Sequence, residues 1–384
     1  MKKVLIVGPL MSNSGYGVHS RQVFNALFQR KNIDLYVKVT GGDSWLLKGK
    51  DIENILNLSK KSNQQEFDES YQIGIPSNWN NIAKKNIGIT AGFESNIVKS
   101  SWLDNINAMD AIIVPSEFTR LSFVNASKRY SKNILTSIKV INEWYYSDID
   151  IMSNFSSFVK NLKYKKNILL VGKLSNISNV ADRKNTIKTL LCCLDFVKDK
   201  KIGVILKASI NSDSVSDKEK LKTFIKNNVP EKLLKNKLSI IVKSLTKSQM
   251  IKLYSDKKVS CFVSGTRGEG FGLPFLESAS LGLPIIATDY SAYKEFLEND
   301  FLKVEYDLKD IGFIDKTFID EDSSPVWAEF RSSSLKQNLD LFFKNTTKYK
   351  LVAKKRQKII KQKLCKRNII GKYNIFFESL EWLL

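Results

Sequence analysis

Short apolar runs alternate with amphipathic segments along most of the chain. Val4–Val7 is a continuous apolar run that ends at Gly8, and apolar residues recur at helical spacing over Val18–Phe28. A buried strand followed by an amphipathic helix is the repeating unit of parallel α/β proteins. The alternation continues to about Trp144. It predicts strands over Ile33–Val39, Ile87–Thr90 and Ala111–Val114, and helices over Ile97–Met109 and from Ser116 to about Ala126.

A change of composition divides this series in two. Tyr146–Lys166 is rich in Ser, Asn and Asp and then basic, which is typical of a connection between domains. A second α/β series follows, with strands over Asn167–Val171, Ile202–Lys207, Leu238–Val242 and Val259–Val263 and helices over Asn185–Val197 and Lys247–Tyr254. The pattern from about Trp327 onward is helical.

These patterns predict an α/β protein with two doubly wound domains that face a central cleft, where ligands bind at the carboxyl ends of the strands. We expect an N-terminal domain at residues 1–150, a linker at 151–166, a C-terminal domain at 167–365 and a helix at 366–384 that returns to the N-terminal domain.

The charge balance points to an anionic partner. The 384 residues include 61 Lys and Arg against 39 Asp and Glu, a net charge of +22. Such a surface attracts nucleic acid, an acidic membrane face or a phosphorylated small molecule. Eleven basic residues and no acidic one lie between Lys344 and Arg367. This run predicts either a solvated helix face or a surface for anionic lipid head groups.

The compartment is inferred from what the sequence lacks. The apolar run at the N-terminus is too short for a signal peptide, and no run of about 18 apolar residues is present to span a bilayer. Cys192, Cys193, Cys261 and Cys365 form no Cys-x-x-Cys pair, so neither a zinc site nor a disulfide framework is predicted. We expect a cytoplasmic protein, and the basic run adds peripheral attachment to the inner membrane face as an option.

The segment Ser264–Phe296, SGTRGEGFGLPFLESASLGLPIIATDYSAYKEF, is the richest in candidate chemistry. A predicted strand ends before it, a glycine-rich loop follows, and a helix is expected to begin near Pro274, which suits a first helical turn. The N–H groups of such a loop and helix start bind anions. Glu269 and Glu277 lie eight residues apart, so their carboxylates can hold hydroxyl groups at two parts of one elongated ligand, such as a sugar and a ribose.

The string EGFGLPFLE, followed by SLGLPIIATD, closely resembles the Glu-x7-Glu signature of retaining glycosyltransferases of the GT-B fold, family four. The resemblance implies that Glu269 contacts hydroxyls of the donor sugar and that Glu277 binds the ribose of a nucleotide-sugar donor. The remaining donor-binding residues of this region are then expected to be Gly270, Phe271, Gly272 and Leu273 at the sugar and phosphate and Ser244 and Leu245 at the nucleobase.

The segment LLVGKLSNISNVADRKNTIKT resembles the strand, loop and helix that carry the cationic pair of this family. Arg183 and Lys184 stand where the helix is expected to begin, so both cations and the helix N-terminus can face the donor diphosphate. They would stabilise the nucleoside diphosphate as it leaves. Lys173, after the strand, stands where many relatives have Arg and is a further candidate donor contact.

Gly15-Tyr16-Gly17, with His19, resembles the glycine loop near the N-terminus of the family, which approaches the donor phosphates and the acceptor. Gly15 and Gly17 are therefore expected at the donor and His19 at the acceptor. The alternative for His19 is a place on the helix surface. Because it is the only histidine, metal or triad chemistry built on several histidines is excluded.

IGITAGFESN, followed by MDAIIVPSEFTRLSF, resembles a subgroup of the family in which a Phe-Glu pair faces the cleft. Glu94 is accordingly a candidate catalytic or acceptor-binding carboxylate, with a helix-capping acid as the alternative. Relatives continue with Thr-Asp and a basic residue, whereas this chain has Ser95 and Asn96. Asp148 and Asp150 fall in the predicted linker, so we do not interpret them as the metal-binding Asp-x-Asp of the other glycosyltransferase fold.

The sequence thus predicts a retaining, metal-independent hexosyltransferase with Glu269, Arg183, Lys184 and Glu94 as catalytic residues. The donor would be a UDP- or GDP-linked hexose, with mannose preferred. The acceptor would be a saccharide or lipid-linked precursor in surface polysaccharide or glycan synthesis. The alternative is a basic protein that binds a membrane or nucleic acid without catalysis, although no nucleic-acid reading module is evident. A nicotinamide-dependent enzyme is disfavoured because Gly8 and Gly15 are too far apart for a dinucleotide fingerprint.

Overall fold

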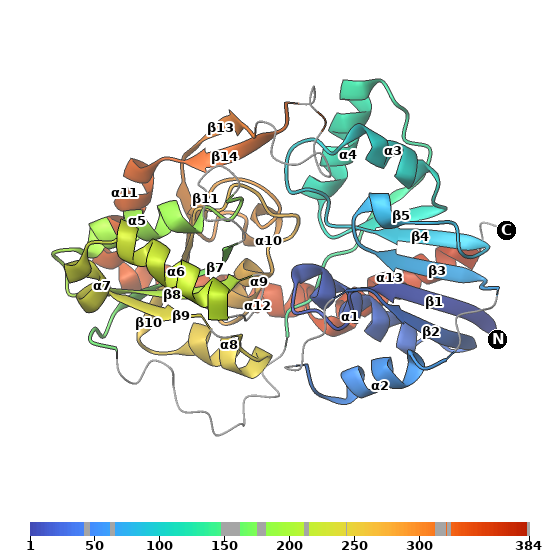
Figure 1. Cartoon of the computed structure of the whole chain (residues 1–384), viewed down its shortest axis with the longest axis horizontal. Coiled ribbons are helices and arrows are strands. Elements are labelled where there is room, and N and C mark those ends of the chain that lie inside the picture. The colour runs from blue at the N-terminus through green and yellow to red at the C-terminus, as the bar shows by residue number, and fades with distance from the viewer. Residues whose placement is uncertain are drawn as a thin grey trace. The chain divides into compact units, whose positions relative to one another are not determined.

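Two compact units make up the protein in the computed structural model (Figure 1). Unit 1 comprises Met1–Trp144, Asp315–Pro325 and Leu364–Leu384, and unit 2 comprises Tyr145–Ile314 and Val326–Lys363. The structure describes residues 1–41, 47–61, 66–146, 162–174, 182–210, 215–242, 244–311, 320 and 324–381. Most of the predicted linker, including Asp148 and Asp150, lies outside the described residues.

Unit 1 is built on a six-stranded parallel sheet with the order β2-β1-β3-β4-β5-β6. Its strands are β1 (Lys2–Gly8), β2 (Ile33–Val39), β3 (Glu69–Ile73), β4 (Lys85–Ile89), β5 (Ala111–Val114) and β6 (Ile138–Val140). Its helices are α1 (Gly15–Phe28), α2 (Lys50–Leu58), a 3-10 turn at Pro76–Asn78, α3 (Ser100–Asn107), α4 (Glu117–Tyr130) and α13 (Lys366–Glu381). The strand order reverses between β1 and β3, which places a topological switch point beside the loop that opens α1.

β3 is a strand that the hydrophobic pattern does not predict. All five of its residues are buried although three are polar. Ser70 Oγ donates to Asn86 Oδ1 at 2.9 Å, Gln72 Nε2 donates to the carbonyl oxygen of Asn80 at 2.6 Å, and Glu69 pairs with Arg30 at 2.6 Å. These partners satisfy the polar groups that burial takes from water, so the strand can occupy the middle of the sheet.

The last helix, α13, packs within unit 1. The rings of Tyr71 on β3 and Phe377 on α13 lie edge to face with centroids 5.6 Å apart. Lys85 Nζ donates to the carbonyl oxygen of Leu380 at 2.6 Å. Residues from both ends of the chain therefore build the core of this unit.

Unit 2 has its own six-stranded parallel sheet, with the order β12-β11-β10-β7-β8-β9. Its strands are β7 (Asn167–Leu174), β8 (Gly203–Ile210), β9 (Leu238–Ile241), β10 (Val259–Ser264), β11 (Ile285–Thr288) and β12 (Leu302–Val304). Its helices are α5 (Thr186–Val197), α6 (Val215–Asn228), α7 (Glu231–Lys237), α8 (Lys247–Ser255), α9 (Leu273–Ser280), α10 (Lys294–Leu297), α11 (Ser332–Lys344) and α12 (Thr346–Lys363). This is the doubly wound dinucleotide-binding order, with its switch point between β7 and β10.

A small two-stranded antiparallel sheet stands apart from this sheet (Figure 1). β13 (Tyr306–Asp310) pairs antiparallel with β14 (Val326–Phe330), so the helical interpretation from Trp327 onward is wrong over β14, and helix begins only at Ser332. The reason is that a short apolar run such as VWAEF fits a strand or a buried helix turn equally well by periodicity. Pairing with β13 decides the conformation.

None of the described helices is both long enough and apolar enough to cross a membrane. All four cysteines are free thiols; Cys192, Cys193 and Cys261 are buried and Cys365 is half-buried.

Candidate functional site

The candidate site of unit 2 lies where β7 and β10 end. The turn that contains Arg183 and Lys184 precedes α5, which follows β7, and the loop with Glu269 follows β10 directly. These two strands flank the switch point of the sheet. Ligands of open α/β sheets bind outside the carboxyl ends of the strands at such a point. Fold topology therefore brings together residues that stand more than 80 positions apart in the chain.

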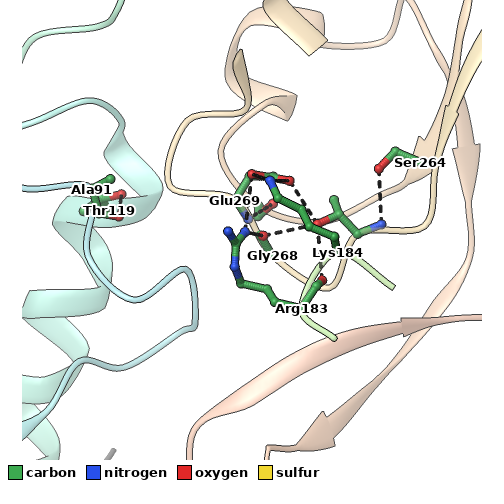
Figure 2. Close-up of polar contacts among 9 residues, drawn as sticks. Ala91, Thr119, Arg183, Lys184, Ser264, Gly268 and Glu269 are labelled. Atoms are coloured by element: carbon green, nitrogen blue, oxygen red, sulfur yellow. Dashed lines mark hydrogen bonds and ion pairs between the residues drawn. The ribbon is translucent and has the colours of Figure 1, made fainter. Parts of the chain in front are cut away.

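A buried carboxylate with two cations forms the centre of the site (Figure 2). Glu269 is 5% exposed, and Lys184 Nζ donates to its two carboxylate oxygens at 2.6 and 2.7 Å. Arg183 Nη1 lies 3.4 Å from Glu269 Oε2 and donates to the carbonyl oxygen of Gly268 at 2.6 Å. Thr266 Oγ1 donates to Glu269 Oε1 at 3.0 Å. The structure thus brings three of the four predicted catalytic residues into direct contact.

The charges of this cluster keep Glu269 ionised. Burial acts to raise the pKa of the Glu269 carboxyl, but the charges of Lys184 and Arg183 and the hydrogen bonds from Lys184 and Thr266 outweigh it and lower the pKa below its ordinary value. The side chains of Arg183 and Lys184 are 24% and 21% exposed. Two cations against one carboxylate leave a net positive charge at a partly open surface, which suits an anionic group carrying hydroxyls.

The N-terminus of α5 does not face the same ligand as the two cations, contrary to the expectation from the sequence. Arg183 and Lys184 form the turn before the helix, and Asp182 Oδ2 accepts hydrogen bonds from the amides of Thr186 and Ile187 at 2.8 and 3.5 Å. These helix amides are therefore occupied by Asp182 and do not face the same anion as the two cations. Asp182 stands three residues before Asn185, the N-cap residue of α5, so it binds these amides from outside the usual capping position.

The glycine-rich loop after Glu269 can contact a ligand through its backbone groups rather than through its side chains. Gly272 caps α9 with a φ of 98°, a left-handed conformation that favours glycine. The side chain of Phe271 is buried and packs against Phe296 with ring centroids 5.3 Å apart. Gly270 is buried, and Leu273 is the first residue of α9. In the first turn of α9, Pro274 has no N–H group, and the amides of Phe275 and Leu276 donate to the carbonyl oxygen of Gly272 at 3.0 and 3.1 Å.

Glu277 lies in α9, beyond the loop. Burial raises the pKa of its carboxyl to about 7, against smaller opposing effects of the Tyr254 hydroxyl and the Lys247 charge. Ser244 and Leu245 lie between β9 and α8 and precede Thr246, which caps α8. Lys173 is the penultimate residue of β7, and its side chain is outside the described residues.

Unit 1 has a second group of predicted residues at the ends of β1 and β4. Tyr16 Oη lies 3.0 Å from Thr90 Oγ1 and accepts from the amide of Ala91 at 3.2 Å, so α1 is tied to the loop after β4. A Cβ on Gly17 would stand 2.1 Å from the carbonyl oxygen of Ser12, whereas Gly15 has open space around its Cα. Only glycine therefore fits at position 17.

Glu94 lies in the loop after β4. The loop is fixed by Thr119 Oγ1, which donates to the carbonyl oxygen of Ala91 at 3.2 Å (Figure 2). Gly92 and Glu94 both have left-handed backbones, with φ of 70° and 62°. A left-handed glutamate stores strain, which is typical of functional positions, and Glu94 is half-buried.

His19 has the surroundings of a core residue. It is 2% exposed, and its Nε2 lies 3.3 Å from Tyr373 Oη on α13. The alternative of a helix-surface position is therefore wrong, and the burial argues against direct contact with an acceptor. Sequence reasoning missed this because Tyr373 stands 354 positions away.

We expect His19 to make stability depend on pH. Burial lowers its pKa from 6.5 to about 4. His19 is therefore protonated near pH 6.5 in the unfolded chain but only near pH 4 in the folded chain. His19 therefore does not lower the free energy of unfolding above about pH 6.5. As the pH decreases below this value, His19 lowers the free energy of unfolding, by roughly 3 kcal/mol at pH 4. Urea unfolding between pH 7 and 4 should show this loss in the wild type and a smaller one in His19→Gln; parallel profiles would contradict it.

The described parts of the chain hold no group of three or more His, Cys, Asp or Glu side chains placed to bind a metal ion.

Residues 147–312 match the family model described as Glycosyl transferases group 1, a range that contains both loops of the unit 2 site. The chain is 27% identical over 135 residues to the GtfA subunit of a UDP-N-acetylglucosamine–peptide N-acetylglucosaminyltransferase from Streptococcus agalactiae. That match covers 34% of this chain and 26% of the relative, so it spans about a quarter of the relative's length.

Solved structures share the fold over the whole chain. HepE (Alr3699) from Anabaena, in complex with UDP and glucose, aligns with a TM-score of 0.62 at 12% identity, covering 99% of this chain and 100% of that one. Sucrose-phosphate synthase from Thermosynechococcus elongatus aligns with a TM-score of 0.64 at 12% identity, covering 100% of both chains. The expected class of two parallel-sheet α/β domains of GT-B type is confirmed. Together the family match and the fold support a GT-B glycosyltransferase.

Proposed function

We propose that the protein is a retaining glycosyltransferase of family four that transfers a hexose from a nucleotide sugar to a hydroxyl group. The observation that carries this proposal is the buried Glu269 carboxylate held by Lys184 and Arg183 at the switch point of unit 2. The cations suit the donor diphosphate and the carboxylate suits the sugar hydroxyls, so one compact cluster serves two parts of a nucleotide sugar.

The proposed reaction is a front-face displacement. The bond between the anomeric carbon and the diphosphate oxygen breaks, and the acceptor oxygen bonds to the same face of that carbon. The acceptor proton passes to the departing phosphate oxygen, while Arg183 and Lys184 hold the charge of the leaving group. Glu269 acts as their counter-ion and binds sugar hydroxyls. Glu94 is the proposed carboxylate on the acceptor side.

UDP and GDP are the two candidate nucleotides of the sugar donor. HepE was solved with UDP and glucose, and the GtfA relative is named for a UDP-linked sugar, which supports UDP. The resemblance to a family subgroup favours mannose linked to GDP. For the acceptor we propose a saccharide or lipid-linked precursor in surface polysaccharide or glycan synthesis at the cytoplasmic face of the membrane.

A donor panel tests this function. UDP- and GDP-linked hexoses are screened by thermal shift, and the release of nucleoside diphosphate is then measured with and without EDTA. One donor should stabilise the chain and be turned over in EDTA, and NMR of the transferred sugar should show the donor's anomeric configuration. Activity that disappears with EDTA and returns with manganese would contradict the metal-independent mechanism.

Glu277 is proposed to bind the ribose. Glu277→Ala is expected to weaken binding of the nucleoside diphosphate by roughly 1–3 kcal/mol, the scale of leaving a buried hydrogen-bonding group without its partner, or about 5- to 150-fold in Kd. Calorimetric titration measures this, with the exposed Glu231→Ala as the control. Unchanged affinity in a folded Glu277 variant would refute the ribose assignment.

We also propose peripheral attachment to anionic membranes through α12. Arg356, the arginine of this helix, is 4% exposed and faces inward, where its Nη2 lies 2.9 Å from Glu298 and 2.8 Å from Asp300. The exposed cations of α12 are all lysines: Lys348, Lys350, Lys354, Lys355, Lys358 and Lys363. Leu351, 63% exposed, lies among them. Lysines are point charges without the planar fork that reads individual phosphates, so this face suits a diffuse layer of lipid head groups better than nucleic acid.

Flotation with liposomes tests the α12 surface. We expect binding to vesicles with anionic lipid at low salt, loss of binding near 1 M salt, where the Debye length is roughly 3 Å, and no binding to neutral vesicles. Lys354→Glu with Lys358→Glu should abolish binding, whereas Lys232→Glu with Lys235→Glu on α7 should not. Absence of binding at low salt, or preference for nucleic acid over anionic vesicles, would contradict the proposal.

A further inference from the structure

Glu329 on β14 reaches the cationic turn of the site from a distant part of the chain. Its Oε2 accepts from Arg267 Nε at 2.7 Å, and its Oε1 accepts from Asn185 Nδ2 at 3.1 Å and from Lys188 Nζ. The Glu329 side chain is 13% exposed. β14 lies beyond residue 312, where the match to the family model ends.

Arg267 continues the connection through the backbone. Its Nη1 donates to the carbonyl oxygen of Asp182 at 3.2 Å, and its amide donates to the carbonyl oxygen of Arg183 at 2.9 Å. The carbonyl oxygen of Arg267 accepts from the amide of Ala328, beside Glu329, at 3.1 Å. The Arg267–Glu329 pair therefore contacts both ends of the 182–185 turn. Arg267 binds its first residue, Asp182, and Glu329 binds its last residue, Asn185.

The last residue of the turn has a costly conformation. Asn185 has φ 48° and ψ 34°, the left-handed region, and it directly follows Lys184. Asn tolerates this region better than most residues other than glycine, but at a cost. The hydrogen bond from Asn185 Nδ2 to Glu329 offsets that cost. Burial opposes ionisation of Glu329, yet Lys188, Arg267 and Asn185 hold its pKa below the ordinary value, so the carboxylate keeps its charge at neutral pH.

We infer that Glu329 and Arg267 are positioning residues that hold Arg183 and Lys184 in place for the donor diphosphate. The inference rests on the proposed function, because it assigns these two residues to the site where the diphosphate binds. Neither residue needs to contact the substrate. Their effect is to fix the backbone on both sides of the two cations, so that Lys184 and Arg183 meet the diphosphate without prior rearrangement.

Variants of the full chain separate positioning from general stability. Glu329→Gln is expected to weaken binding of the nucleoside diphosphate roughly 10- to 100-fold and to leave the affinity for the nucleoside unchanged, because the nucleoside lacks the phosphates. Glu305→Gln, which weakens an exposed ion pair with Arg331 next to the sheet of β13 and β14, is the control and should bind both ligands like the wild type.

A second pair of variants tests the conformation of Asn185. Asn185→Ala should lose diphosphate affinity, since alanine is strained at this φ, whereas Asn185→Gly should retain most of it because glycine adopts left-handed angles freely. Glu329→Gln should also cost less affinity in the Asn185→Gly background.

The possible outcomes distinguish the inference from the proposed function. If the wild type binds the nucleoside diphosphate and Glu329→Gln binds it equally tightly, the inference alone is overturned. So would equal losses of nucleoside and diphosphate affinity, which indicate a merely structural role. A wild-type chain that binds neither UDP nor GDP would overturn the proposed function together with the inference.

Discussion

Lys184→Ala is expected to lower the rate of sugar transfer at saturating donor by about 10²- to 10³-fold, the usual effect of removing one group that stabilises transition-state charge. Lys184 Nζ lies at the centre of the cluster, within 2.7 Å of both Glu269 oxygens. In the proposed reaction, negative charge accumulates on the diphosphate as its bond to the sugar breaks, and Lys184 is closer than Arg183 to the carboxylate proposed to bind the sugar. Steady-state kinetics with the preferred donor measures the loss.

Stability must be separated from catalysis in this variant. Of the two cations Lys184 and Arg183, removing Lys184 takes from the buried Glu269 the closer one and leaves Arg183 at 3.4 Å, so some loss of stability is expected. Adding Glu269→Gln removes the uncompensated charge and should restore stability but not activity. Lys198→Ala, at the exposed far end of α5, is the control for charge. A rate within threefold of the wild type in Lys184→Ala would refute the catalytic role.

Arg30→Met is expected to destabilise the folded chain by about 3–5 kcal/mol, the usual cost of removing one partner of a buried ion pair. The side chains of Arg30 and Glu69 are nearly inaccessible, and Arg30 Nη1 lies 2.6 Å from Glu69 Oε2. Burial acts to raise the pKa of Glu69, but Arg30 holds it below its ordinary value. Without Arg30, the carboxylate is left mainly with Tyr71 and the partly exposed Lys2.

Urea unfolding measures the effect of Arg30→Met. The double variant with Glu69→Gln should recover much of the loss, because no charge then remains in the middle of the sheet. Lys84→Ala, which breaks an exposed pair with Asp68, should leave the midpoint unchanged. A midpoint for Arg30→Met equal to that of Lys84→Ala would show that the Glu69 pair contributes nothing to stability.

The same ion pair shows which strands could be predicted from sequence. Ile33–Val39 and Ala111–Val114 were found with their bounds unchanged, because their buried residues are apolar and periodicity detects apolar burial. β3 was not predicted, since its burial depends on Arg30, Asn86 and Asn80, which lie outside the strand, 39, 16 and 8 positions from their partners on it. A polar strand can be recognised only when its partners are known.

The residues of the candidate site also fall into those that the sequence predicted and those that it did not. Glu269, Arg183 and Lys184 were identified through local strings that resemble a family motif, and the structure brings them into contact. Glu329 was missed because its partner Asn185 lies 144 positions away and because β14 was expected to be helical. Contacts of this kind depend on the pairing of β13 with β14, which no local pattern encodes.

The most direct test of the central claim is calorimetric titration of UDP and GDP into the wild-type chain and into Lys184→Ala, in EDTA. We predict that one of the two nucleotides binds the wild type with one-to-one stoichiometry and that Lys184→Ala binds it at least tenfold more weakly. The expected loss follows from the removal of a charge-assisted contact worth roughly 1.5–3 kcal/mol. If neither nucleotide binds the wild type, or if Lys184→Ala binds as tightly as the wild type, the cluster of Glu269, Lys184 and Arg183 is not a diphosphate site.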